Sequence, residues 1–238
     1  MNHATHNNLD NRKAIVLLSG GLDSAVTLAV LHADGFQCST LAIDYGQRHG
    51  VELEFAQRVS RALGAVEHRQ VTVDLRALGG SALTADIAVP KDRDLAAGDI
   101  PVTYVPARNT IFLSMALGFA ESVGARHIAF GANALDYSGY PDCRPDFIEA
   151  FQRLANVATR DGVQAAAAGQ AWFQVHAPLL RMTKAQIVLT GKKLGVDFAL
   201  TTSCYDPGAN AKPCGQCDSC RLRAKGFTQA GVIDPRVM

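Results

Sequence analysis

The chain has 238 residues, of which 48% are hydrophobic and 19% are charged. It is long enough for one sizeable globular domain, and this composition excludes an intrinsically disordered protein. Its 23 basic and 22 acidic residues leave a net charge of +1. Because proteins that bind nucleic-acid phosphates usually carry a basic excess, the charge favours a small-molecule substrate and predicts no nucleic-acid partner.

The first residues of the chain predict its location. Residues 1–12 form a polar tail that lacks the apolar core of a signal peptide. No uninterrupted apolar run of about 18 residues follows it, so we expect no membrane span. The sequence is therefore typical of a cytoplasmic protein, in which cysteines more often serve metals or chemistry than disulfides.

Strand-like and helix-like segments alternate along most of the chain. Five apolar runs indicate strands: 14–18, 38–44, 66–73, 127–133 and 173–176. Five periodic segments indicate helices: 25–33, 51–63, 109–123, 145–159 and 183–194, the last capped by Thr183. This alternation predicts the α/β class, with a doubly wound parallel sheet.

Two segments depart from that pattern. Residues 74–107 contain several prolines and little periodicity, and long loops of this kind often contribute to binding sites. We expect this segment to lie on the substrate side of the domain. The alanine-rich run 165–169 is too short to be interpreted beyond a helix or a spacer.

The segment SGGLDS, at 19–24, joins the first predicted strand to the first predicted helix. It lacks the lysine of the GxxxxGK[ST] phosphate loop and the spacing of the GxGxxG dinucleotide loop. One interpretation is a tight turn in which Asp23 or Ser24 caps the helix. The other is an anion site, and the two are compatible because both use the free amides of a helix N-terminus.

Four of the six cysteines lie between residues 204 and 220. Four thiolates at this spacing can close a tetrahedral zinc site, although an iron–sulfur cluster uses the same ligand type. The Cys-Pro ending of ferredoxin-type motifs is absent, so we favour structural zinc, bound by Cys204, Cys214, Cys217 and Cys220. Cys143 stands apart in a polar loop, where lining a pocket is favoured over a covalent role.

The loop and several distant segments resemble known families. SGGLDS after an apolar strand resembles the SGGxDS pyrophosphatase loop of the ATP pyrophosphatase (PP-loop) superfamily. Over about residues 13–227 the chain also resembles the 7-cyano-7-deazaguanine synthase family, in DYGQRHGVELEFA (44–56), VPARNTIFLSMALGFAE (105–121), GANALDYSGYPDCRPDFIEAF (131–151), LLRMTKAQIV (179–188) and SCYDP…PCGQCDSCRLRAKGF. We therefore expect a PP-loop ATP-binding domain at 13–200 and a zinc-binding segment at 201–238.

The resemblance implies a ligase that forms carbon–nitrogen bonds at the expense of ATP. A 7-carboxy-7-deazaguanine would be adenylated and converted by ammonia into its amide. A second adenylation of the amide oxygen would then leave the nitrile, 7-cyano-7-deazaguanine. AMP and pyrophosphate would be released in each round, and Mg²⁺ would accompany ATP.

The resemblance also implies roles for individual residues. The expected catalytic residues are Ser19, Asp23, Ser24, Arg108 and Lys184. The expected ATP-binding residues are Leu18, Ser19, Gly20, Gly21, Leu22, Asp23, Ser24, Ala25, Val26, Thr27 and Leu28. The deazapurine is expected to contact Gln47, His49, Asn109, Asp136, Tyr137, Tyr140, Asp142 and Arg144. Structural alternatives remain open for Arg108 and for Asn109, which would cap a helix, and for Lys184, which would face solvent.

Two other functions fit parts of the sequence. A PP-loop enzyme that thiolates or aminates a tRNA base would share the loop, but it would favour a basic surface. A non-catalytic zinc-ribbon interaction module would share only the cysteines. A homodimer is expected because it is the commonest assembly of soluble proteins.

Overall fold

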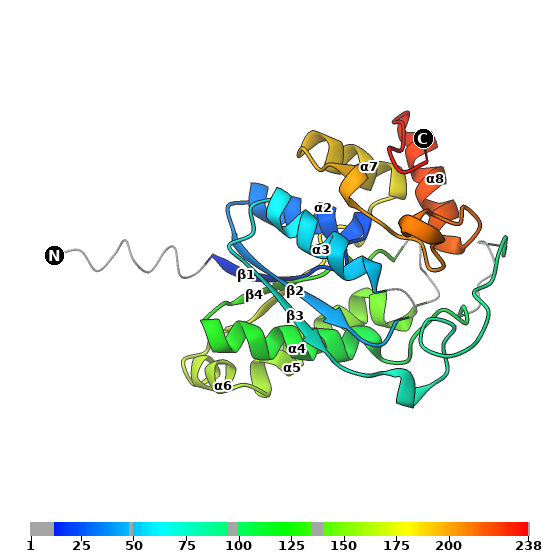
Figure 1. The fold of residues 1–238 in the computed structure, drawn as a ribbon. Coiled ribbons are helices and arrows are strands. Elements are labelled where there is room, and N and C mark those ends of the chain that lie inside the picture. Colours follow the sequence, from blue (N-terminus) through cyan, green and yellow to red (C-terminus); the bar gives the residue numbers. More distant parts are fainter. Residues whose placement is uncertain (1–11, 48–49, 95–99, 135–139, 238) are drawn as a thin grey trace.

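Five parallel strands form a single sheet in the order β3-β2-β1-β4-β5 (Figure 1). A computed structural model of the protein describes residues 12–47, 50–94, 100–134 and 140–237. The strands are β1 (Lys13–Leu17), β2 (Gln37–Asp44), β3 (Glu67–Thr72), β4 (His127–Ala129) and β5 (Gln174–His176). The all-parallel pairing confirms the predicted fold class.

Helices cover both faces of this sheet (Figure 1). One face carries α2 (Leu22–Ala33), α3 (Val51–Ala62), α7 (Lys184–Lys193) and α8 (Asp218–Ala230). The other carries α4 (Arg108–Val123), α5 (Pro145–Val157) and α6 (Arg160–Ala167). Single 3₁₀ turns lie at Arg76–Leu78, Pro141–Cys143, Phe198–Leu200 and Ala209–Ala211. None of the helices in the described ranges is long and apolar enough to cross a membrane.

The central strand β1 divides the hydrophobic core into two layers. Successive side chains of a strand point to opposite faces, so Ile15 packs with the α4 and α5 layer while Val16 packs with the α2 and α7 layer. Both side chains are almost completely buried. Burial on both faces explains why this strand is a continuous apolar run in the sequence.

The strand order reverses direction at β1, where the chain leaves toward β2 and later returns to the other side at β4. Open α/β sheets bind ligands in the crevice at this point, beyond the carboxyl ends of the strands. Gly131, just after β4, makes a close approach there. A Cβ atom on it would lie 3.0 Å from the Ser24 nitrogen, so a glycine allows β4 to meet the first turn of α2.

Several element boundaries differ from the predicted ones. Helix α2 begins at Leu22 with Gly21 as its N-cap, so the predicted cap by Asp23 or Ser24 is wrong. Both residues lie instead in the first turn, where the Ser24 hydroxyl donates to the Gly21 carbonyl at 3.0 Å. Likewise, Ala107 rather than Asn109 is the N-cap residue of α4. The sequence pattern did not predict the first residues of these two helices. The N-cap residues, Gly21 and Ala107, make no side-chain capping hydrogen bond, so the fold sets where each helix begins.

Toward the C-terminus, one predicted helix cap is confirmed and one helix was not predicted. The predicted cap of α7 is confirmed: the Thr183 hydroxyl accepts from the Gln186 amide, and the Gln186 side chain accepts from the Thr183 amide. Helix α8 was not predicted, since its sequence is polar and begins within the cysteine cluster. It packs against α7, with Phe227 buried beside Phe198.

The contact between α7 and α8 depends on a glycine. A Cβ atom on Gly226 of α8 would lie 2.3 Å from Cγ and 2.9 Å from Cβ of Lys184. These atoms belong to the root of the lysine side chain, which cannot move aside without moving α7. Because Gly226 has only a hydrogen atom in place of a side chain, α7 and α8 can approach this closely.

We expect Gly226→Ala to lower the free energy of unfolding by about 1–3 kcal/mol, because the added methyl overpacks the α7–α8 contact. The matched control is Gly118→Ala, inside α4, where a Cβ atom would meet nothing within 4 Å. The control should gain about 0.4–1 kcal/mol, because alanine loses less backbone entropy on folding. Urea unfolding measures both, and equal effects at the two positions would contradict the packing role of Gly226.

Candidate functional site

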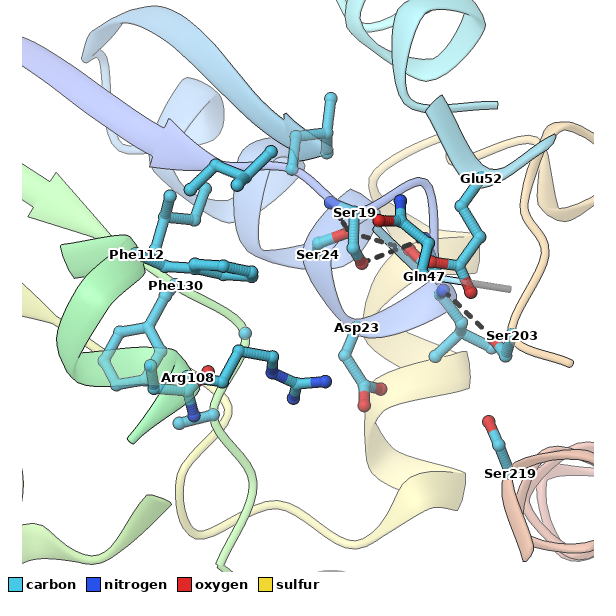
Figure 2. Close-up of a pocket in the computed structure, with 18 of the residues that line it drawn as sticks. Ser19, Asp23, Ser24, Gln47, Glu52, Arg108, Phe112, Phe130, Ser203 and Ser219 are labelled. Carbon is cyan, nitrogen blue, oxygen red and sulfur yellow. Dashed lines mark hydrogen bonds between the residues drawn. The ribbon is translucent and has the colours of Figure 1, made fainter. Parts of the chain in front are cut away.

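A cavity of about 230 Å³ opens beyond the carboxyl ends of β1, β2 and β4 (Figure 2). Its walls combine the SGGLDS loop, the start of α4 and the segment that leads into the cysteine cluster. The lining residues that carry polar side chains are Ser19, Asp23, Ser24, Tyr45, Gln47, Glu52, Arg108, Asn109, Asn133, Tyr140, Cys143, Thr202, Ser203, Cys204, Tyr205 and Ser219. The cavity therefore lies at the crevice where this sheet class binds its ligands.

The SGGLDS loop is held in one conformation by its own serines. The Ser24 hydroxyl accepts from the Ser19 amide and lies 3.2 Å from the Ser19 hydroxyl. Gly20 adopts a φ of 79°, and a Cβ atom on it would lie 2.5 Å from the Glu52 carbonyl oxygen. A side chain is excluded there both by the backbone conformation and by α3.

Helix α2 begins within this motif, at Leu22, and directs its N-terminus at the cavity. The first amides of a helix have no partner within the helix, and the helix dipole places positive charge at the same end. Gly21, as the N-cap, offers no side chain that would satisfy these amides. The loop and the helix together have the geometry of a phosphate site.

Asp23 and Lys184 form an ion pair beside this site. The Lys184 ammonium donates to both carboxylate oxygens of Asp23, at 2.8 and 2.7 Å. The Lys184 side chain is 8% exposed and that of Asp23 is 22% exposed, so the lysine is enclosed while the carboxylate still borders the cavity. The solvent-facing alternative for Lys184 is therefore wrong, because the side chain is buried against Asp23. A catalytic role for Lys184 stays a prediction.

Arg108 brings a positive charge into the cavity from the opposite wall. Figure 2 shows its guanidinium pointing from the start of α4 toward Asp23. The preceding residue, Ala107, has a φ of 54°, a left-handed conformation that non-glycine residues rarely adopt. Its amide donates to the Tyr104 hydroxyl at 3.1 Å. This unusual turn aims the first side chain of α4 into the cavity rather than along the helix.

Glu52, in the first turn of α3, places a carboxylate in the same cavity. Burial raises the pKa of Glu52 to about 7, and the nearby charge of Arg108 opposes this rise only in part. A carboxyl group in a cavity with a pKa near neutrality is suited to exchange protons at physiological pH. It was missed by the sequence analysis, because a glutamate early in a helix usually stabilises the helix dipole.

Asp142 and its neighbours are organised around the start of α4. The Asp142 carboxylate accepts from the Asn109 amide at 3.1 Å, and the Asn109 side chain donates to the Asp142 carbonyl at 3.1 Å. Asp142 is buried behind the cavity wall, where burial raises the pKa of its carboxyl group. Its second carboxylate oxygen has no hydrogen-bond partner among the residues that the structure describes.

The thiol of Cys143 borders the cavity and lies 3.4 Å from the Asn109 side-chain nitrogen. Burial, together with the neighbouring Asp142 charge, raises the pKa of Cys143 to about 12. A covalent nucleophile needs the thiolate, which such a pKa suppresses at neutral pH. The environment therefore favours lining of the cavity, the alternative preferred from the sequence.

The four cysteines of the C-terminal cluster meet at one point. The sulfur atoms of Cys204, Cys214, Cys217 and Cys220 all lie within 4.8 Å of one another, so they can hold a metal ion. Backbone amides donate to two of them, including the Cys214 amide to the Cys204 sulfur at 3.2 Å. Ala82 and Val89, from the 74–107 segment, pack against the cluster. The donor set of four thiols fits zinc or another thiophilic metal.

The structure brings together ten of the eighteen predicted site residues that it describes. Those that line the cavity are Leu18, Ser19, Gly21, Leu22, Asp23, Ser24, Gln47, Arg108, Asn109 and Tyr140. Those that do not line it are Gly20, Ala25, Val26, Thr27, Leu28, Asp142, Arg144 and Lys184. Arg144 is exposed, and Ala25 to Leu28 are buried in α2. His49, Asp136 and Tyr137 lie outside the described residues.

The segment before the cysteine cluster also borders the cavity. The Thr202 amide donates to the Gly20 carbonyl at 2.9 Å, and Ser203 and Ser219 both line the cavity wall. The sequence analysis assigned these residues no role. The sequence did contain a signal for the two serines. Each immediately precedes a cysteine of the predicted metal-binding motif, Cys204 or Cys220.

Known proteins resemble the chain along nearly its whole length. The model of the family described as queuosine biosynthesis protein QueC matches residues 13–231. A protein named 7-cyano-7-deazaguanine synthase from Geobacter sulfurreducens is 61% identical over 224 residues, covering 94% of this chain and 92% of its own. The protein of the same name from Myxococcus xanthus is 59% identical over 226 residues, covering 94% of this chain and 96% of its own.

A solved structure resembles the fold. NMN synthetase from Francisella tularensis aligns with a TM-score of 0.50 at 16% identity, covering 96% of this chain and 80% of that one. At this identity the likeness concerns the fold alone. The family assignment comes from the sequence matches, which span the sheet, the loop and the cysteine cluster: the chain belongs to the QueC family of queuosine biosynthesis proteins.

Proposed function

We propose that this protein converts 7-carboxy-7-deazaguanine and ammonia into 7-cyano-7-deazaguanine with the consumption of ATP. The observation that carries the proposal is the SGGLDS loop, which opens with the N-terminus of α2 on the cavity in a chain of this family. The names of the two relatives agree with this product. The enzyme is then a ligase that forms a carbon–nitrogen bond.

The proposed chemistry uses two adenylations in sequence. The substrate carboxylate attacks the α-phosphorus of ATP, which releases pyrophosphate and leaves an acyl adenylate. Ammonia then adds to the acyl carbon, AMP departs, and loss of a proton gives the amide. In the second round the amide oxygen attacks another ATP, and departure of AMP with loss of the remaining protons leaves the nitrile. Each adenylation converts an oxygen that leaves poorly into one that leaves as AMP.

The loop residues stabilise the departing pyrophosphate in this proposal. The amides at the start of α2 and the hydroxyls of Ser19 and Ser24 would bind its oxygens, which carry most of the negative charge that develops. Arg108 would compensate charge near the α-phosphate or the substrate carboxylate from the opposite wall. ATP would enter with Mg²⁺, for which the carboxylate of Asp23 is an oxygen donor of the appropriate type.

The deazapurine occupies the remaining part of the cavity in this proposal. Gln47, Asn109 and Tyr140 line the cavity and offer hydrogen-bonding groups and an aromatic face. Asp142 would act indirectly, by fixing the Asn109 amide at the start of α4. The roles of His49, Asp136, Tyr137 and Arg144 stay predictions from the sequence, as do the homodimer, the cytoplasmic location and the domain boundary at residue 201.

Glu52 is the proton acceptor that we propose for the amide-forming step. Ammonia becomes positively charged nitrogen when it adds to the acyl adenylate, and a proton has to leave for the amide to form. A carboxylate whose pKa is raised to about 7 accepts such a proton more readily than an ordinary, more acidic one. Arg108 opposite it would help to keep the carboxylate charged between turnovers.

Zinc is the metal that we propose for the cysteine cluster. Four thiolates complete its tetrahedral shell and leave no position open for a reacting molecule, so the role is structural. Two residues before Cys204, the Thr202 amide donates to the Gly20 carbonyl, and through this hydrogen bond the cluster would support the SGGLDS loop.

The proposal is tested by incubating the protein with 7-carboxy-7-deazaguanine, ammonium and Mg-ATP and analysing the products by mass spectrometry. We expect the nitrile, AMP and pyrophosphate. Formation of ADP and phosphate would overturn the adenylation chemistry. Turnover only with a tRNA substrate, together with tight and salt-sensitive tRNA binding, would favour the tRNA-modifying alternative instead.

We expect Asp23→Asn to reduce pyrophosphate release by about 100-fold or more, because it weakens an oxygen donor that we propose for the Mg²⁺ accompanying ATP. The matched control is Asp34→Asn at the exposed C-terminus of the same helix, which should retain the wild-type rate. Steady-state assays of pyrophosphate measure both. A variant at position 23 that remained as active as the control would exclude Asp23 from the chemistry.

We expect Glu52→Gln to lower the amide-forming rate by about 10²-fold or more. Because the wild-type group is deprotonated above its pKa of about 7, the ratio of wild-type to variant rate should rise with pH through that value and then level off. The ratio cancels the greater availability of ammonia at high pH, which affects both proteins. Glu54→Gln, an exposed position on the same helix, is the control, and a pH-independent ratio at position 52 would refute the proton-acceptor role.

We expect Cys217→Ser to reduce the metal content from about one zinc ion per chain to nearly none and to lower the Tm, because metal binding contributes directly to folding. Cys38→Ala, in β2 and remote from the cluster, should keep its zinc. Elemental analysis and thermal unfolding provide the two readouts. Visible absorbance from the purified wild-type protein would instead indicate an iron–sulfur cluster.

A further inference from the structure

Two serines from the cysteine segment line the cavity beside the SGGLDS loop. Ser203 directly precedes Cys204, and Ser219 directly precedes Cys220, so both hydroxyls extend from backbone that carries a sulfur of the cluster. Both line the cavity, and Figure 2 shows Ser219 pointing into the space next to Asp23 and Ser203. At both positions, a serine is the residue immediately before a cysteine of the cluster.

The Ser219 hydroxyl is nearly buried but unpaired within the described part of the chain. The residue is 6% exposed, yet its hydroxyl has no hydrogen bond to any of the residues that the structure describes. A hydroxyl in such surroundings normally forms a hydrogen bond, since a buried polar group without one costs free energy. The partner is therefore expected in the cavity that Ser219 lines.

Ser203 lies against the phosphate loop itself. Its hydroxyl accepts from the Leu22 amide at 3.5 Å, the length of a weak hydrogen bond. The adjacent Thr202 amide donates to the Gly20 carbonyl at 2.9 Å, which fixes this segment beside the loop. As an acceptor toward Leu22, the Ser203 hydroxyl keeps its own hydrogen available for a ligand oxygen.

The start of α8 adds the electrostatic character of an anion site. Ser219 lies in the first turn of this 13-residue helix, where free amides and the helix dipole favour negative charge. The acidic residue of the same turn, Asp218, is paired with Arg93 at 3.0 Å. Two helix N-termini, those of α2 and α8, thus face one cavity.

We propose that Ser203 and Ser219 bind the terminal phosphates of ATP, and the pyrophosphate that is released, from the cysteine segment beside the SGGLDS loop. This assignment rests on the proposed use of ATP, and it adds two phosphate-binding residues outside the loop motif. It also gives the cysteine cluster a part in catalysis: a bound metal fixes the backbone from which both hydroxyls donate. The phosphates are then held by both the loop and the metal-binding segment.

The test measures direct binding of Mg-ATP and of Mg-pyrophosphate by calorimetry in the absence of the acid substrate. We expect Ser203→Ala and Ser219→Ala each to weaken the affinity for both ligands about tenfold, or ~1.4 kcal/mol, for the lost hydrogen bond to a charged oxygen. Ser203→Thr, which retains a hydroxyl, should restore most of the affinity. Ser114→Ala on the exposed face of α4 is the matched control and should bind like the wild type.

Metal content and Tm are measured on the same samples and should stay at the wild-type values. Wild-type affinity in both alanine variants would overturn the inference. Loss of affinity in step with loss of metal would also overturn it, because the serines would then act only on the cluster. A wild-type protein that binds Mg-ATP with these serines but forms no nitrile would refute the proposed function and leave this inference supported.

Discussion

The ammonium group of Lys184 holds both carboxylate oxygens of Asp23, and this contact joins parts of the chain that are 161 residues apart. Asp23 lies in the first turn of α2, and Lys184 is the first residue of α7. Removing one partner of an enclosed pair typically costs about 3–5 kcal/mol, because the other charge is left without compensation. The pair therefore constrains where the second half of the chain lies relative to the SGGLDS loop.

The packing around this pair continues into the cysteine segment. Gly226 lets α8 lie against the root of the Lys184 side chain, and α8 begins at the cluster that Cys217 and Cys220 help to form. From the same cluster the chain leads back through Thr202 to the carbonyl of Gly20. The SGGLDS loop is thus enclosed by α7, α8 and the cysteine segment, which explains why a cysteine cluster remote in sequence borders the same cavity.

Charge within the cavity is distributed between its walls. The paired Asp23 and Lys184 nearly compensate each other, whereas Arg108 contributes a positive charge from the start of α4. Glu52 faces these groups with a pKa that burial raises to about 7. A cavity of this kind can attract an anion at the loop and exchange protons beside it, and these are the two requirements of an adenylation followed by an amination.

The sequence by itself determined the features that depend on neighbouring residues. The apolar run of β1, the glycine-rich loop after it, the Thr183 cap and the spacing of the four cysteines are local patterns, and the structure has each of them in the expected place. Only the tertiary structure decided which distant side chains share the cavity. The pairing of Asp23 with Lys184, and the approach of Ser203 to Leu22 across 181 residues, follow from how α7, α8 and the cysteine segment pack onto α2. Such contacts leave no periodic trace in the sequence, because each depends on the packing of elements that are distant along the chain.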